Sequence, residues 1–164
     1  MLSDMSYQYK ERGKTKLMAK YCPEKQNYAL YSDCKECEEK TCDAFFCLVV
    51  GSRTFNDYAL LSEKLDAFLK GKDKVVIVSG GAKGADALAE RYAKDKGYPL
   101  KVFPANWDEL GKRAGYVRND EMHAYIAKMP HRGCVAFWDG KSKGTRHSLL
   151  LAKNYRNPMR IVKV

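Results

Sequence analysis

Short hydrophobic runs alternate with segments of helical periodicity through the second part of the chain. The runs occupy residues 46–50, 75–78, 100–103, 134–138 and 160–164, and we predict a strand at each of them. Three of the runs are continuous rather than alternating with polar residues. A continuous hydrophobic run of this length is typical of a strand that is buried on both faces of a parallel sheet.

Between the runs, hydrophobic residues recur at the spacing of one helical face. Residues 85–93 show this pattern without a gap, with small or hydrophobic side chains at positions i, i+3, i+4, i+7 and i+8. Comparable segments at 58–69, 114–128 and 145–154 bring the number of predicted helices to four. Each predicted helix is followed by a residue that interrupts helices, namely Gly71, Gly97, Pro130 and Pro158.

The alternation of strands and helices predicts an α/β fold with an open, mainly parallel five-stranded sheet and helices on both faces. Because the alternation begins near Ala44, we expect two parts: a small cysteine-rich segment over residues 1–44 and the α/β domain over residues 45–164. In open parallel sheets, ligands bind outside the carboxyl ends of the strands. The loops that follow the predicted strands are therefore where we expect a functional site.

Three of these loops bring glycines and small hydroxyl residues to the start of a predicted helix. Their sequences are GSRTF at 51–55, SGGAKGAD at 79–86 and DGKSKGT at 139–145. Glycines let the backbone approach a ligand closely, and the N-terminus of a helix attracts anions. Arg53 in the first loop can form a bidentate contact with a phosphate. Further positive potential comes from Lys83, Lys141 and Lys143.

Each loop, taken by itself, is also explained by a tight turn with a helix cap. Thr54 and Asp57, for example, have the spacing of a capping box. None of the three contains GxGxxG, and SGGAKGAD lacks the terminal Gly-Lys-Ser/Thr of a Walker loop, which disfavours a nicotinamide dehydrogenase and a P-loop ATPase. Three such loops on one sheet edge favour a phosphate-bearing small ligand.

The charge of the chain is concentrated in its second part. The 30 basic and 20 acidic residues give a net charge of +10, and residues 1–47 contribute none of it because they carry eight of each kind. The excess favours an anionic partner, either a nucleotide or a nucleic acid. We expect no membrane association and a cytoplasmic chain, since the N-terminus is charged and no apolar run approaches the length of a membrane span.

The cysteines fall into two groups. Cys22, Cys34, Cys37 and Cys42 form the pattern C-x11-C-x2-C-x4-C, which predicts a structural zinc site with four thiolate ligands. Their segment has few large aliphatic residues, so a metal would supply stability that burial cannot. The alternative is four reduced thiols on an extension of the domain. Cys47 and Cys134 lie in predicted strands, where we expect them to act as small core residues.

Three stretches of the second part resemble a known family. VVGSRTFNDYALL, IVSGGAKGADALAERYAKDKGYPLKVFPANWDELGKRAGYVRNDEM and AFWDGKSKGTRHSLLLAK resemble the YspA/YpsA-related family of the SLOG superfamily, which is named for Smf/DprA and the LOG enzymes. The resemblance covers residues 47–164 and implies a Rossmann-like fold, a nucleotide-derived ligand and a homodimer. The ligand-binding residues implied by the loops and the resemblance are Gly51, Ser52, Arg53, Ser79, Gly80, Gly81, Gly84, Asp86, Arg118, Asn119, Gly144 and Thr145.

The chain departs from the LOG enzymes where their chemistry is concentrated. LOG-type phosphoribohydrolases carry PGGxGTxxE after the fourth strand, whereas here only Gly144 and Thr145 match and Ser148 stands in the place of the glutamate. Cleavage of an N-glycosidic bond requires a carboxylate, for which Asp86 or Asp139 could substitute. If the chain is an enzyme, it is a hydrolase of a nucleotide derivative, with Asp86 and Arg118 as candidate catalytic residues.

Three hypotheses about function follow. The first is a protein that binds a nucleotide derivative, as a sensor or an enzyme, and the second is a DprA-like nucleic-acid-binding module. The third, a LOG-like N-glycosidic hydrolase, is disfavoured by Ser148. Among the remaining candidate side chains, we expect His123 on a helix surface without a catalytic role, and we expect Trp138 to pack in the core rather than stack on a base.

Overall fold

The second part of the chain folds around a five-stranded sheet that is parallel throughout. The structure is a computed structural model and describes residues 6–11, 14–22, 27–30 and 44–164. The strand order is β6-β5-β4-β7-β8. The strands are β4 (Phe45–Gly51), β5 (Val75–Ser79), β6 (Leu100–Val102), β7 (Arg132–Trp138) and β8 (Met159–Lys163). The sequence-based prediction of an open α/β sheet is confirmed, and the fold is Rossmann-like.

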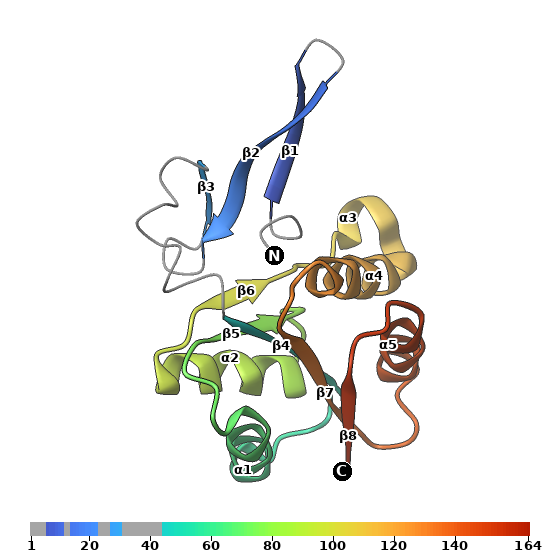
Figure 1. Ribbon diagram of the computed structural model, residues 1–164. Helices are drawn as coiled ribbons and strands as arrows, with labels where there is room; N and C mark the ends of the chain where they lie inside the picture. Colours follow the sequence, from blue (N-terminus) through green and yellow to red (C-terminus); the bar gives the residue numbers. More distant parts are fainter. Residues whose placement is uncertain (1–5, 12–13, 23–26, 31–43) are drawn as a thin grey trace.

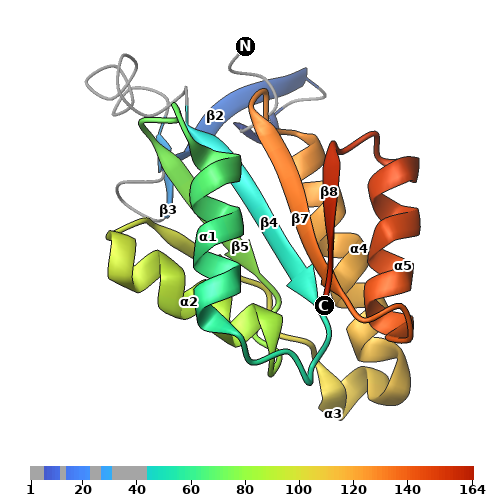
Figure 2. The ribbon, with the colours of Figure 1, turned by 90° about the horizontal axis from the view of Figure 1, so that it is seen from below.

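Helices cover both faces of this sheet, as predicted (Figures 1 and 2). Helices α1 (Tyr58–Leu69) and α2 (Ala85–Lys96) lie on one face, and α4 (Ala114–Ala127) and α5 (Lys143–Asn154) lie on the other. The chain leaves β4 toward β5 and β6 in one direction and later adds β7 and β8 in the other. The direction of winding therefore reverses between β4 and β7, which is where sheets of this type bind ligands.

The core consists of two hydrophobic layers, one on each face of the sheet. Along β4, Cys47 and Val49 belong to the layer under α1 and α2, while Phe46 and Leu48 belong to the layer under α4. All four side chains are fully buried, as the continuous hydrophobic run predicts. Cys47 and Cys134 are core residues as expected, and burial raises the pKa of the Cys134 thiol to about 12.

The ends of two helices differ from the sequence-based expectation. Helix α1 is capped by Asp57, whose carboxylate accepts a hydrogen bond from the Leu60 N–H at 2.9 Å, so the capping box starting at Thr54 is wrong. Because the cap is Asp57, Phe55 stays in the loop between β4 and α1. There it is buried and stacks on Phe137, with the ring centroids 5.1 Å apart. Helix α5 begins at Lys143, two residues earlier than expected, because Ser142 caps it.

A short helical connection that was not predicted leads into α4. It consists of α3 (Trp107–Leu110) and a single 3₁₀ turn (Gly111–Arg113). Asn106 caps α3 by accepting a hydrogen bond from the Glu109 N–H. At four and three residues, the two pieces are too short to show helical periodicity in the sequence.

The N-terminal part forms a separate antiparallel sheet of order β1-β2-β3. Its strands are β1 (Ser6–Glu11), β2 (Lys14–Cys22) and β3 (Asn27–Leu30). Cys22 is the last residue of β2, and Cys34, Cys37 and Cys42 lie outside the described residues, so the zinc site stays a prediction. Within the part of the chain that the structure describes, no helix combines the length and the hydrophobicity needed to cross a bilayer.

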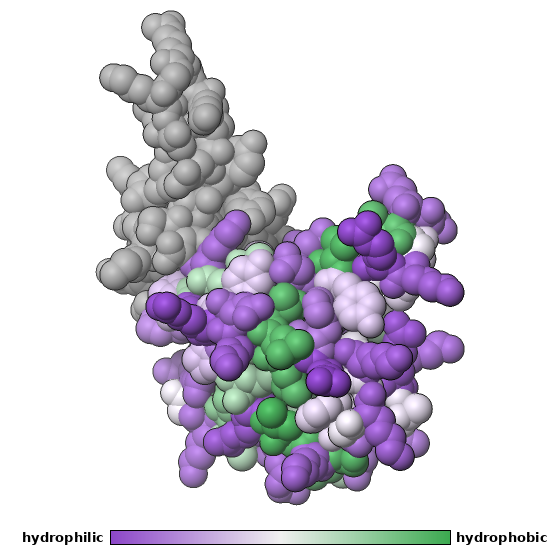
Figure 3. Space-filling view, turned by 90° about the vertical axis from the view of Figure 1, so that its right-hand side faces the viewer, coloured by the Kyte–Doolittle hydropathy of each residue, from purple (hydrophilic) through white to green (hydrophobic). Residues whose placement is uncertain are grey.

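The molecular surface at the β8 edge of the sheet carries hydrophobic residues among charged ones. Figure 3 shows this face with hydrophobic residues in green between hydrophilic residues in purple. The exposed hydrophobic side chains of this edge include Leu150 on α5 and Ile161 on β8, which are 56 % and 50 % exposed. Single exposed residues of this kind are common on soluble domains.

Candidate functional site

A cleft of about 500 Å³ lies at the carboxyl ends of β4 and β7, where the sheet reverses its direction of winding. Its lining comes from the loop after β4, the start of α2, the segment from α3 into α4, and the loop from β7 into α5. This volume falls within the roughly 300–1,000 Å³ typical of small-molecule sites. Eight of the predicted ligand-binding residues line the cleft: Gly51, Ser52, Arg53, Asp86, Arg118, Asn119, Gly144 and Thr145.

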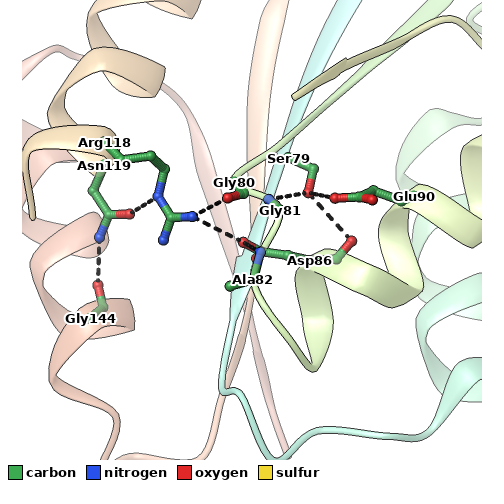
Figure 4. A network of polar contacts seen from close by, with 9 residues as sticks. All are labelled: Ser79, Gly80, Gly81, Ala82, Asp86, Glu90, Arg118, Asn119 and Gly144. Carbon is green, nitrogen blue, oxygen red and sulfur yellow. Dashed lines mark hydrogen bonds and ion pairs between the residues drawn. The ribbon is translucent and has the colours of Figure 1, made fainter. Parts of the chain in front are cut away.

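The other four predicted residues lie behind the cleft, in the loop between β5 and α2. Ser79 is fully buried, and its hydroxyl contacts the Glu90 carboxylate at 2.8 Å and the Gly81 N–H at 3.2 Å (Figure 4). Gly84 has φ +78°, and a Cβ on it would overlap the Ser52 carbonyl oxygen. Here the glycines allow two loops to pack against each other, which is one of the two roles their residue type permits.

A network of buried polar contacts joins three elements around the cleft (Figure 4). Arg118 on α4 donates to the Gly80 carbonyl and to Asn119 Oδ1, the latter at 3.1 Å. Its Nη1 also lies 3.7 Å from Asp86 Oδ2 at the start of α2. Asn119 Nδ2 donates to the Gly144 carbonyl at the start of α5, at 3.2 Å. Arg118 and Asn119, which the family resemblance implied, therefore hold the walls of the cleft together.

The Arg118–Asp86 pair is almost fully buried, with each side chain less than a tenth exposed. Burial raises the pKa of the Asp86 carboxyl, although Arg118 and the Ala82 N–H act in the opposite direction. Burial likewise lowers the pKa of Arg118, against the attraction of Asp86. Within the pair, the two charges compensate each other. The two candidate catalytic residues are therefore brought together as a structural ion pair.

The charge and aromatic surface at the mouth of the cleft come from other residues. Arg53 is exposed, and its guanidinium carbon lies 5.7 Å from the centre of the Trp107 ring. Trp107 is 49 % exposed and Tyr116 is 45 % exposed. Both line the cleft together with Lys112. A basic group beside exposed aromatic rings can bind an anion and stack on a planar group.

Sequence reasoning assigned no binding role to Trp107, Lys112 or Tyr116, and it considered Trp138 as a stacking residue before favouring a packing role for it. Trp107 and Lys112 lie in the short connection before α4; the family resemblance covers this stretch but implied no site residue within it. Trp138 does not line the cleft; it is partly buried at the end of β7, and its Nε1 donates to the Ser142 carbonyl at 3.3 Å. The sequence offered one signal for Trp107. It is a single tryptophan in the polar stretch NWDELGKR, which has no hydrophobic pattern that would predict a buried position for it.

A buried histidine, which sequence reasoning placed on the surface, lies next to the cleft-lining Ser148. His123 is fully buried between α4 and α5, and its Nε2 lies 2.8 Å from Ser148 Oγ. Ser148, the residue in the position of the LOG glutamate, is 1 % exposed and lines the cleft. Burial lowers the pKa of His123 to about 4, so the ring is neutral. The expectation of an exposed His123 is wrong because α5 covers that side of α4.

Both carboxylates that could replace the LOG glutamate have structural partners. Asp139 Oδ1 accepts hydrogen bonds from the Lys141 and Ser142 N–H groups at 2.9 and 2.8 Å, which hold the turn before α5. These bonds lower the pKa of Asp139, so it remains ionised. Asp86 is held by Arg118 and Ala82. One oxygen of each carboxylate is therefore engaged in holding the walls of the cleft, Oδ2 of Asp86 and Oδ1 of Asp139.

Comparisons with known proteins agree with this architecture. The model of the YspA, cpYpsA-related SLOG family matches residues 47–109, which span β4 to α3 and include the first two loops. The Gene 61 protein of Mycobacterium phage D29 is 35% identical over 118 residues, a match that covers 68% of this chain and 91% of that protein.

Two solved structures share the fold at low sequence identity. One concerns the single-stranded DNA binding mode of DNA processing protein A from Helicobacter pylori, with a TM-score of 0.54 and 19% identity over 71% of this chain. The other is DNA processing protein A from Streptococcus pneumoniae, with a TM-score of 0.53 and 20% identity over 75% of this chain. This chain spans 64% of the first protein and 52% of the second.

The resemblance stated from the loop sequences is thus supported by a family match, by a relative covered over nearly its whole length and by the fold. The family match rests on the stretch that contains GSRTF and SGGAKGAD. The relative extends the likeness to 68% of this chain. The chain belongs to the SLOG superfamily, within its YspA, cpYpsA-related family.

Proposed function

We propose that the cleft between β4 and β7 binds a nucleotide-derived ligand through its phosphate groups. The observation that carries this proposal is that the loop after β4, the α3–α4 segment and the start of α5 line one cleft, with Arg53 exposed beside Trp107. Because the Asp86–Arg118 pair is compensated, Arg53 and Lys112 are the cations that remain to attract an anion.

The backbone at the start of α5 supports an anionic ligand as well. Gly144 and Thr145, in the first turn of α5, line the cleft. The first N–H groups of a helix and its dipole favour a negative charge at this end. No acidic residue occurs in the first turn of α5 to compensate the dipole. A phosphate at this position would lie beside the basic groups of the opposite rim.

A thermal-shift panel of AMP, ADP, ADP-ribose and NAD tests the proposal. At least one compound should raise the Tm of the wild type, since a ligand that binds only the folded state stabilises it. The shift should decrease in Arg53→Ala and persist in Arg160→Ala, which removes an exposed arginine of β8 outside the cleft. Absence of any shift in the wild type, or equal shifts in the wild type and Arg53→Ala, would contradict the proposal.

A DprA-like nucleic-acid-binding module is the second candidate function. It is favoured by the exposed Trp107 and Tyr116 and by the net charge of +10, all of which falls after residue 47. Exposed aromatic rings in a basic groove bind the bases of single strands. The structural neighbour from Helicobacter pylori is described by its single-stranded DNA binding mode.

Binding of a fluorescent oligothymidylate at several salt concentrations separates the two candidates. A nucleic-acid module should lose affinity linearly on a log–log plot, with a slope on the order of several units. A site for a mononucleotide should show a shallower slope. No oligonucleotide binding at low salt would exclude the second candidate.

We also propose that Cys22, Cys34, Cys37 and Cys42 bind one structural zinc ion. What supports it is the spacing of the four cysteines and the thiolate chemistry of closed zinc sites. Native mass spectrometry of the full chain should show the mass of one zinc that is lost with a chelator. A metal-free mass after purification without chelator would contradict this proposal.

A further inference from the structure

A chain of buried hydrogen bonds begins at Ser148 on the floor of the cleft and leads away from it. Ser148 Oγ lies 2.8 Å from His123 Nε2, and His123 Nδ1 lies 3.2 Å from Asn157 Nδ2. Asn157 Oδ1 accepts a hydrogen bond from Arg132 Nε at 2.8 Å. Ser148, His123 and Asn157 are each at most 5 % exposed, and buried polar groups of this kind are hydrogen-bonded.

The partners of Asn157 determine its orientation. Arg132 carries donors only, so the atom of Asn157 that faces it is the carbonyl oxygen. The amide nitrogen therefore faces His123, where it also donates to the His123 backbone carbonyl at 3.1 Å. Since His123 Nδ1 meets an N–H group, it must act as the acceptor. A neutral imidazole in this position carries its proton on Nε2.

This tautomer decides what Ser148 can do. His123 Nε2–H donates to Ser148 Oγ, so the hydroxyl oxygen is already an acceptor and its own proton is available for another bond. Among the residues that the structure describes, His123 is the sole hydrogen-bond partner of Ser148 Oγ. The burial that lowers the pKa of His123 to about 4 keeps the ring in this neutral form at neutral pH.

A serine nucleophile needs a base that takes its proton, and a histidine protonated on Nε2 cannot serve as that base. A hydroxyl that accepts a hydrogen bond is, however, polarised into a better donor. We propose that Ser148 is a specificity-determining hydrogen-bond donor that contacts a phosphate oxygen of the bound ligand, and that His123 and Asn157 position its proton. This inference rests on the proposed binding of a phosphate-bearing nucleotide derivative in the same cleft.

The donor role makes the loss of Ser148 costly for binding. A hydrogen bond from a neutral donor to a charged group corresponds to about a 10- to 100-fold change in affinity. Ser148→Ala should weaken binding of the panel compounds by that factor. Ser62→Ala, on α1 outside the cleft, is the matched control and should leave affinity unchanged.

Asn157→Asp tests the positioning role without altering the lining of the cleft. An aspartate keeps an oxygen for Arg132 but places a second acceptor opposite His123 Nδ1, which moves the proton of the neutral ring from Nε2 to Nδ1. Ser148 would then donate to His123 and no longer to the ligand. At pH 8.5, this variant should also bind about 10-fold more weakly, and Ser148 should become reactive toward a fluorophosphonate.

The deciding experiment combines calorimetry with the four panel compounds, long-range ¹H–¹⁵N spectra of His123 and fluorophosphonate labelling, all on the full chain. Support consists of an Nε2–H tautomer in the wild type, no labelling of wild-type Ser148, and weaker binding by both variants. Wild-type binding that Ser148→Ala leaves unchanged, an Nδ1–H tautomer, or labelling of wild-type Ser148 would overturn the donor role alone. Failure of the wild type to bind any of the four compounds would overturn the proposed function together with it.

Discussion

The loop after β4 and the loop after β5 are similar in composition but differ in their position relative to the cleft. Both follow a buried parallel strand and both are rich in glycine and serine. Residues 51–54 line the cleft, whereas residues 79–81 lie behind it and hold Arg118 and Glu90. In both loops the glycines mark a close approach of protein atoms, since a Cβ on Gly51 would overlap Ala85 and the Phe137 carbonyl and a Cβ on Gly84 would overlap Ser52. The difference teaches that glycine-rich composition by itself does not tell which loop lines a cleft.

Gly84→Ala should have the largest effect and should act on stability. The position has φ +78°, and the new Cβ would overlap the backbone of Ser52 and Arg53. We expect a loss of about 4 kcal/mol in the free energy of unfolding, since both strain and overpacking contribute. Urea denaturation measures it. Gly71→Ala has the same φ and open space around it, so it should cost only about 1 kcal/mol; equal losses would contradict the packing role of Gly84.

Arg118→Met should have the next largest effect. It leaves the Asp86 carboxyl buried without its cation and removes the donor to the Gly80 carbonyl. Breaking a buried pair from one side costs about 3 kcal/mol. If Arg118 were instead a rim residue like Arg53, the variant would unfold at the same urea concentration as the wild type.

The pH dependence of stability should report the buried His123. Its pKa is about 4 in the folded chain and near 6.5 in the unfolded chain, so between these values the unfolded chain binds a proton that the folded chain does not. Stability contributed by the neutral ring is therefore present above pH 6.5 and is lost as the pH falls toward 4. From pH 7 to 4.5 we expect a decrease of about 2 kcal/mol from this group.

The matched variant for that experiment is His123→Gln, in which the side-chain amide can still donate to Ser148 but does not titrate. Other acidic groups act equally in both proteins, so the difference between the two pH profiles isolates His123. Identical profiles for wild type and variant would show that His123 is not buried in its neutral form.

Arg53→Ala should have the smallest effect on stability. Arg53 is exposed and contacts Trp107 through a single cation–π contact, so its removal should change the free energy of unfolding by no more than about 0.5 kcal/mol. The same variant should weaken binding of a phosphate-bearing nucleotide about 10-fold. A large loss of stability would mean that the first loop, like the second, is primarily structural.

Much of the fold follows from the sequence because the strands are buried on both faces. The continuous run from Phe46 to Val50 is typical of an interior strand, and helix α2 showed its periodicity completely. The sequence also predicts that the loops after the strands lie close together, because the carboxyl ends of parallel strands share one edge of the sheet whatever the strand order. The Rossmann-like arrangement itself was implied by the resemblance, and the strand order bears it out.

The parts of the site that escaped prediction depend on tertiary contacts. Trp107 and Lys112 line the cleft because a short connection without helical periodicity runs beside it, and Tyr116 lines it from the first turn of α4. His123 is buried because α5 packs on α4, a contact that the sequence of α4 alone does not encode. Ser79 and Gly84 have the residue types of a ligand-binding loop, but their partners are protein atoms: Ser79 contacts Glu90 on α2, and Gly84 packs against the backbone of Ser52.

Mapping of amide chemical shifts in the full, ¹⁵N-labelled chain tests the central claim most directly. Titration with AMP, ADP, ADP-ribose and NAD should shift the amides of Gly51, Arg53 and Gly144 and the indole of Trp107, while the amides of Gly71 and Leu150 stay unchanged. That result would place the ligand in the cleft between β4 and β7. Shifts confined to residues outside the cleft, or no shifts with any of the four compounds, would contradict it.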